Sequence, residues 1–177
     1  MKPAYVPAGV IPAVLLPFHE DLSIDEASYR AHLRDVASVE GVSAITVNAH
    51  ASEVASCSFD EQRRVLEISR EETKLPLING IYAEGSLEAA RLAKMATQGG
   101  ASALLVFPSG IYTFGQRPEM ALAHFKRIAD ATDLPLILFQ YPLAGGQGYP
   151  TATLLKILDE VPTVRAIKDW CANAQLH

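Results

Sequence analysis

One lysine and one tyrosine end apolar runs in the C-terminal part of the sequence, where each could carry chemistry. Tyr141 ends the run 136–141, and Lys168 ends the run 164–168. If these runs are neighbouring parallel strands, about 4.8 Å apart, the two long side chains can meet over the end of the sheet. A desolvated amine becomes a nucleophile toward carbonyl carbon, and a phenol can donate and accept the protons that the addition moves. The pair indicates an amine-catalysed reaction of a carbonyl compound, whereas either residue alone is more often an ordinary surface group.

A second set of residues offers metal chemistry as an alternative. His50 and Glu53 form an H-x-x-E motif after one apolar run, and His19 follows the preceding run. Imidazole and carboxylate groups bind divalent cations, so His19, His50 and Glu53 could serve a metal-dependent aldolase. The motif follows a strand rather than lying on a helix, and no third histidine has suitable spacing. We therefore expect no metal site and no cofactor.

Six apolar runs alternate with helical patterns and would position these residues. We expect strands at 10–16, 42–47, 77–81, 103–107, 136–141 and 164–168. Ser23 with Glu26 and Ser58 with Glu61 have the capping-box spacing that begins a helix. Strict alternation of continuous apolar strands with helices is typical of a parallel sheet covered by helices.

Two α/β architectures fit this alternation, a doubly wound open sheet and a (β/α)8 TIM barrel. The first strand is not followed by Gly-x-Gly-x-x-Gly, and polar residues gather after the strand ends, where barrel enzymes carry their chemistry. We therefore expect a single barrel domain over residues 1–177 that covers about the first six βα units. We expect its inner face to include Leu15, Val47, Val106 and Ile167.

Composition narrows the classes of partner. The chain has 177 residues, 49% of them hydrophobic, and a net charge of −5 without any dense cluster of Lys and Arg, which disfavours nucleic acid. No apolar run approaches the roughly 20 residues of a membrane span, and prolines interrupt the N-terminal stretch where a signal peptide would need an apolar core. Cys57 and Cys171 have neither disulfide-framework nor metal spacing. We expect a cytoplasmic protein without a membrane partner.

Two short motifs resemble the dihydrodipicolinate synthase / N-acetylneuraminate lyase family of class I aldolases. Ala166-Ile167-Lys168-Asp169 is similar to the family's lysine motif, and Tyr141-Pro142 to its tyrosine site; the similarity runs in order from the Gly9 strand to Lys168. The resemblance implies a (β/α)8 barrel, usually a tetramer of paired dimers, whose lysine forms a Schiff base with pyruvate or a related 2-oxo acid. Lys168 would then be the Schiff-base residue and Tyr141 the proton relay, with no metal or organic cofactor.

The segment after the second strand departs from the family pattern. Where the family has Gly-Thr-Thr-Gly-Glu, this chain has Ala49-His50-Ala51-Ser52-Glu53. The family's hydroxyls bind the substrate carboxylate and assist the tyrosine. By this resemblance His50, Ala51 and Ser52 would bind substrate here, with His50 or Ser52 replacing the hydroxyls.

Two further segments also depart from the pattern of the family. The synthase's second relay tyrosine aligns with 108–111, and Tyr112 is a near neighbour that could bind substrate. The arginine that grips the synthase's aldehyde substrate is replaced by the glycine-rich stretch 144–148, where Gln147 could contact a hydroxylated partner such as a sugar-acid chain. True dihydrodipicolinate synthase activity is therefore not expected.

These observations predict a 2-oxo-acid lyase or aldolase, with a catalytically inactive barrel fragment or ligand-binding remnant as the alternative. The chain stops at His177, whereas the family has two more strands, so we expect a truncation after the sixth strand. Two open strand edges would then need cover, which favours a homo-oligomer.

Overall fold

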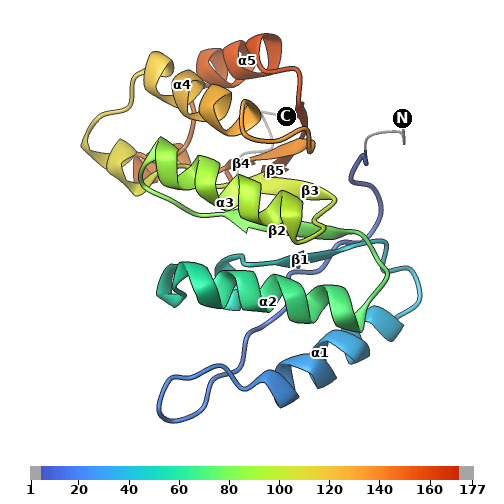
Figure 1. Cartoon of the computed structure of the whole chain (residues 1–177). Helices are drawn as coiled ribbons and strands as arrows, with labels where there is room; N and C mark the ends of the chain where they lie inside the picture. Colours follow the sequence, from blue (N-terminus) through green and yellow to red (C-terminus); the bar gives the residue numbers. More distant parts are fainter. Residues whose placement is uncertain (1–4, 172–177) are drawn as a thin grey trace.

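The computed structural model describes residues 5–171, so the ends of the expected 1–177 domain lie outside the described residues. One parallel sheet runs in the order β1-β2-β3-β4-β5, and α1 to α5 lie along one face of it (Figure 1). The strands are β1 (Ile45–Val47), β2 (Leu77–Ile81), β3 (Ala103–Val106), β4 (Leu136–Gln140) and β5 (Val164–Asp169). The α-helices are α1 (Glu26–Ser38), α2 (Phe59–Glu72), α3 (Ser86–Gln98), α4 (Pro118–Ala129) and α5 (Thr151–Glu160). Short 3-10 helices follow strand ends: η1 (His50–Ser52), η2 (Val54–Ser56), η3 (Gly110–Phe114) and η4 (Leu143–Gly145).

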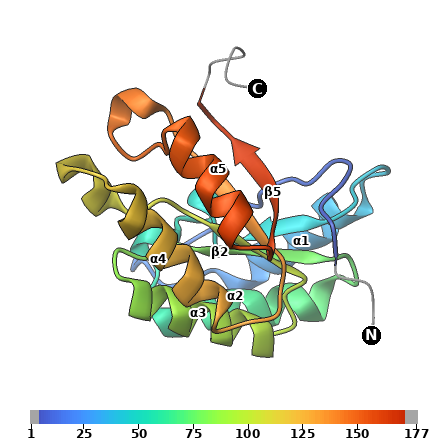
Figure 2. The ribbon, with the colours of Figure 1, turned by 90° about the horizontal axis from the view of Figure 1, so that it is seen from above.

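The expected α/β barrel architecture is present. Each of the strands β1 to β4 is followed by a helix that returns the chain to the next parallel strand, and consecutive helices pack against each other around the outside of the sheet (Figure 2). Within the described residues no helix is long and apolar enough to cross a membrane.

The first expected strand is reduced to isolated bridges. Val10 pairs with Val42 and Ala13 pairs with Thr46, both in parallel, and Thr46 N–H donates to the carbonyl of Pro12. The paired residues are 32 positions apart in the first bridge and 33 in the second, so the register shifts by one residue between them. Pro12, which lies between the bridges, has no N–H to donate to a neighbouring strand. A continuous ladder therefore cannot form, and the expectation of a full strand at 10–16 was wrong.

One of the two expected capping boxes is confirmed. The Ser58 hydroxyl accepts from Glu61 N–H, and the Glu61 carboxylate accepts from Ser58 N–H, at the start of α2. At α1 the N-cap is Asp25, and the Ser23 hydroxyl instead donates to Asp21. The expected Ser23 box was wrong because an aspartate closer to the helix supplies the accepting oxygen.

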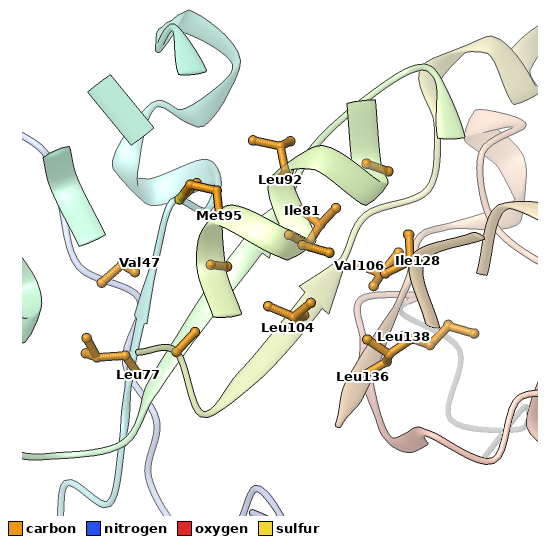
Figure 3. Packing of buried hydrophobic residues seen from close by; sticks show 14 of the residues in the cluster. Val47, Leu77, Ile81, Leu92, Met95, Leu104, Val106, Ile128, Leu136 and Leu138 are labelled. Atoms are coloured by element: carbon orange, nitrogen blue, oxygen red, sulfur yellow. The ribbon is translucent and has the colours of Figure 1, made fainter. Parts of the chain in front are cut away.

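The main core lies between the sheet and the helices. Figure 3 shows Leu92 and Met95 of α3 above side chains from the sheet. The buried strand residues on this side include Val47, Leu77, Ile81, Leu104, Val106, Leu136 and Leu138. Val47 and Val106 thus point toward the helices, and their expected place on the inner face was wrong.

The opposite, concave face carries a second apolar cluster. Its buried members are Ala44, Ala49, Ile78, Ala103, Leu105, Phe107, Ile137, Phe139 and Tyr141. The N-terminal segment 7–13 lies against this face, and together they enclose a cavity of about 390 Å³.

A β-bulge separates β4 from regular pairing with β5. Leu136 pairs with Val164, but the next pair is Ile137 with Ala166, so Arg165 is an extra residue. Because side chains alternate between faces along a strand, this one-residue shift exchanges the faces of all later β5 residues relative to β4.

The bulge decides which side chain of β5 reaches the concave face. Lys168 pairs with Phe139 of the concave cluster, whereas Ile167 pairs with Leu138 of the helix-side core. Ile167, which is 42% exposed, still lines the cavity on the concave face together with Ala166 and Lys168. Leu15 is 61% exposed, and its expected inner position stays a prediction.

Ser58→Ala removes the accepting hydroxyl of the α2 cap and should lower the free energy of unfolding by about 1 kcal/mol, measured by urea denaturation. Ser38→Ala is the control, because its hydroxyl bonds only the Asp35 carbonyl at the exposed end of α1. Equal losses for both variants would contradict a specific role of the capping box.

Candidate active site

Lys168 brings its amine to the concave face at the C-terminal end of the sheet. Its Nζ lies 4.1 Å from the centroid of the Phe139 ring. The side chain keeps contact with solvent, but partial burial of the amine lowers the pKa of Lys168 below its usual value. A lowered pKa increases the fraction of neutral, nucleophilic amine near neutral pH.

The amine adjoins a cavity of about 320 Å³. Its lining includes two of the expected substrate-binding residues, His50 and Ala51, together with Ala13, Ala49, Phe139, Lys168, Asp169 and Trp170. Three alanines in this lining leave open the space in front of the amine.

Tyr141 is joined to His50 by a hydrogen bond between its hydroxyl and Nε2 of the imidazole. Burial, and secondarily Tyr82, raise the pKa of Tyr141. Burial, and secondarily the charge of Lys168, lower the pKa of His50. Both side chains are therefore held neutral near pH 7, and the imidazole tautomer decides which of them donates in their hydrogen bond.

The imidazole of His50 is fixed by aromatic neighbours. It stacks on the Phe107 ring at 4.9 Å between centroids and 7° between planes, and Tyr82 meets it edge-on at 6.0 Å. A second small cavity, of about 140 Å³, lies between His50, Glu53 and Tyr82.

The backbone before His50 is held by a polar network. Asn48 has a φ of 51°, and its Nδ2 donates to Asn79 Oδ1 at 2.8 Å and to the Gln62 carbonyl at 2.9 Å. Gly80 permits this path, since a Cβ there would lie 1.8 Å from the Asn48 carbonyl oxygen and 3.1 Å from the Phe107 ring. A glycine on β2 thus lets η1 carry His50 to the concave face.

The remaining expected substrate-binding residues lie elsewhere. Ser52 is buried, and its hydroxyl donates to the Val14 carbonyl at 2.8 Å. Tyr112 packs against Tyr149 at 6.1 Å in the helix-side core, where burial raises its pKa to about 12. The Gln147 carbonyl accepts from Gln116 on the loop, and Gln147 does not line the cavity beside Lys168.

The structure does not bring His19, His50 and Glu53 together as the metal-dependent alternative would require. His19 lies in an exposed turn where its N–H donates to the Ser23 carbonyl, and it does not share a cavity lining with His50 or Glu53. Across residues 5–171 no group of three or more His, Cys, Asp or Glu side chains is placed to hold a metal ion.

Four aromatic residues of this site were missing from the sequence-based candidates: Tyr82, Phe107, Phe139 and Trp170. Tyr82 directly follows a predicted strand, Phe107 ends one, and Trp170 follows β5 closely, whereas Phe139 lies inside the predicted strand 136–141. Position after a strand end was the available signal, because the ends of parallel strands share one edge of the sheet.

Sequence comparison places this chain beside known enzymes. The family model described as the dihydrodipicolinate synthetase family matches residues 6–177. A 4-hydroxy-tetrahydrodipicolinate synthase from Methanosarcina mazei is 34% identical over 168 residues, which cover 94% of this chain and 56% of that protein. A 4-hydroxy-tetrahydrodipicolinate synthase from Salinibacter ruber is 33% identical over 165 residues, which cover 91% of this chain and 53% of that protein. The chain spans about half the length of the curated relatives it matches.

Solved structures agree with the fold. A chloride-inhibited dihydrodipicolinate synthase from Acinetobacter baumannii, complexed with pyruvate, has a TM-score of 0.81 and 29% identity, covering 91% of this chain and 55% of that one. CdNal from Clostridium difficile, in complex with mannosamine, has a TM-score of 0.87 at 23% identity, covering 95% and 58%. The second likeness concerns the fold alone. The expected family and the expected barrel fold are both confirmed.

Gly80→Ala should displace the Asn48 backbone and lower the free energy of unfolding by about 1–3 kcal/mol, because the added methyl has no space. Chemical denaturation measures this loss. Gly145→Ala is the matched control, since a Cβ there meets nothing within 4 Å. A neutral Gly80→Ala would show that the close approach of η1 to β2 is not required.

Proposed function

This chain belongs to the dihydrodipicolinate synthetase family, and on that premise we propose that Lys168 forms a Schiff base with pyruvate or a related 2-oxo acid. The proposal rests chiefly on the register of β5, which points the amine into the cavity that His50 lines. The lowered pKa of Lys168 supports it, because only the neutral amine attacks a carbonyl.

The reaction begins when the Lys168 amine adds to the keto carbon. The carbonyl oxygen then leaves as water, and an iminium remains. The cationic iminium acidifies the neighbouring carbon, whose proton leaves to give an enamine. That enamine carbon attacks an aldehyde in condensation, and the reverse sequence cleaves the bond. The iminium is the electron sink, so this route needs no metal or organic cofactor.

Tyr141 and His50 act together as the proton relay in this scheme. The phenol gives its proton to the departing oxygen. The imidazole then passes its Nε2 proton to the phenolate across their hydrogen bond and takes up a proton at Nδ1. His50 thereby supplies the group that a threonine hydroxyl supplies in the pattern expected for the family. The Ser52 hydroxyl donates to the Val14 carbonyl, which favours His50 for that role.

Several finer expectations stay predictions. These are substrate contacts by Ala51, Ser52, Tyr112 and Gln147, a cytoplasmic location and assembly as a homo-oligomer. True dihydrodipicolinate synthase activity is still not expected, since among residues 5–171 no arginine lines the cavity beside Lys168.

Incubation with pyruvate and borohydride should add one reduced pyruvyl group to Lys168, located by peptide mass spectrometry. Lys168→Ala should lose the adduct, and Lys156→Ala, on the exposed side of α5, should keep it. Labelling should persist in EDTA. An adduct on another lysine would overturn the assignment, and no adduct at all would favour a catalytically inactive chain.

His50→Gln should slow exchange of the pyruvate methyl protons in D₂O about 100-fold, because general acid–base groups typically contribute 10²–10⁴. Only neutral imidazole accepts a proton, so wild-type exchange should fall as pH drops through the lowered pKa of His50, below 6.5. The amine of Lys168 titrates in both proteins, so their difference isolates His50. The measurement is proton NMR of the methyl signal.

The control variant is His19→Gln, which changes a histidine outside the cavity and should exchange like wild type. Loss of exchange in His19→Gln, restored by zinc, would instead favour the metal-dependent alternative. An unchanged profile in His50→Gln would remove His50 from the relay.

A further inference from the structure

Aromatic side chains gather on the concave face beside Lys168, whose Nζ lies 4.1 Å from the centroid of the Phe139 ring. We call this set the aromatic wall: His50, Tyr82, Phe107, Phe139, Tyr141 and Trp170. Its members come from η1 and from the ends of β2, β3, β4 and β5, so that strands far apart in sequence contribute to one surface.

The rings of the wall form a continuous series. Phe107 meets Phe139 at 5.2 Å, Phe139 meets Tyr141 at 4.7 Å, and Tyr141 meets Trp170 at 5.4 Å between centroids. All three contacts are edge-to-face, with interplanar angles of 68–80°. Phe107 and Tyr141 are buried behind this surface, whereas Trp170 at the end of the series is 56% exposed. His50, Phe139 and Trp170 are the members of the wall that line the cavity beside Lys168.

The charges around the amine disfavour an acidic partner. Three cavities adjoin Lys168 or His50, and among residues 5–171 they are lined by no arginine and by no lysine other than Lys168. Two acids, Glu53 and Asp169, do line them. A second carboxylate on the substrate would meet like charge there, with no cation beyond the one used in catalysis.

Half of the residues that line the cavity beside Lys168 are alanine or phenylalanine, which offer no side-chain hydrogen bond to hydroxyl groups. Ala13, Ala49 and Ala51 offer no side-chain hydrogen bonds, and the Nε2 of His50 is already bonded to Tyr141. Buried hydroxyls without partners lose free energy relative to water. The lining is suited to a flat apolar group.

We propose that the partner carbonyl compound of this site is an aromatic aldehyde, and that the aromatic wall binds its ring; this rests on the proposed Schiff base at Lys168. The enamine carbon derived from pyruvate forms a bond to the aldehyde carbon, and the aldehyde oxygen takes a proton from Tyr141. Water then adds to the iminium and releases the amine. Pyruvate and the aldehyde thus give one 4-aryl-4-hydroxy-2-oxobutanoate, with no oxidant or reductant.

The test compares three 2-oxo acids by borohydride trapping on Lys168: pyruvate, 2-oxo-4-phenylbutanoate and 2-oxohexanedioate. The phenyl compound should half-saturate trapping at a concentration about 10-fold below that of the dicarboxylate. Trp170→Leu should weaken the phenyl compound relative to pyruvate by about 2- to 10-fold, the size of a lost aromatic contact. Phe114→Leu is the control, since its ring is 92% exposed on η3 and lines none of the three cavities.

The outcomes separate this inference from the proposed function. Trapping of pyruvate without a preference for the phenyl compound would overturn the aromatic partner and leave the Schiff base standing. If pyruvate is not trapped, 4-phenylbutanoate, which has no keto group, still reports on the wall through fluorescence of Trp170, the one tryptophan of the sequence. Saturable quenching would then support the aryl site and refute the lysine chemistry, and absence of quenching would overturn both.

Discussion

Alternation of side chains along a strand is the constraint on which the site depends. Helices cover one face of the sheet, so every strand must send alternate residues into the helix-side core and the others to the concave face. In β5 a regular register would pair Ile167 with Phe139 and send Lys168 to the helix side. The extra residue Arg165 shifts the pairing by one and puts the lysine on the concave face. Because of this one bulge, Lys168 is a candidate nucleophile on the concave face and not a lysine on the helix side of the sheet.

Close backbone approach is the second requirement. The loop after β1 must pass near β2 for the His50 ring to stack on Phe107, and the missing side chain of Gly80 gives it that space. Asn48 fixes the path by hydrogen bonds to Asn79 and Gln62, which satisfy amide N–H groups that would otherwise be buried unpaired. The stability of this end of the sheet and the geometry of the site come from the same contacts.

Burial moves three side chains toward their neutral forms. It lowers the pKa of Lys168 and of His50 and raises that of Tyr141. The directions differ, but the cause is shared, since a less polar surrounding disfavours a charge of either sign. An amine that attacks carbonyls and a phenol–imidazole pair that exchanges protons both need that neutrality. Three aromatic side chains, those of His50, Phe139 and Trp170, line the cavity beside the Lys168 amine.

The sequence by itself determined the alternation of strands and helices, the cap of α2 and the positions of Tyr141 and Lys168 at strand ends, because these follow from local patterns of apolar and capping residues. It could not determine that Lys168 pairs with Phe139 of the concave face, since a bulge is a property of two paired strands. Nor could it separate His50 from Ser52 and Tyr112 as site residues. Those side chains found partners in Tyr141, Val14 and Tyr149, which are distant in sequence, and only the packed tertiary structure decides such contacts.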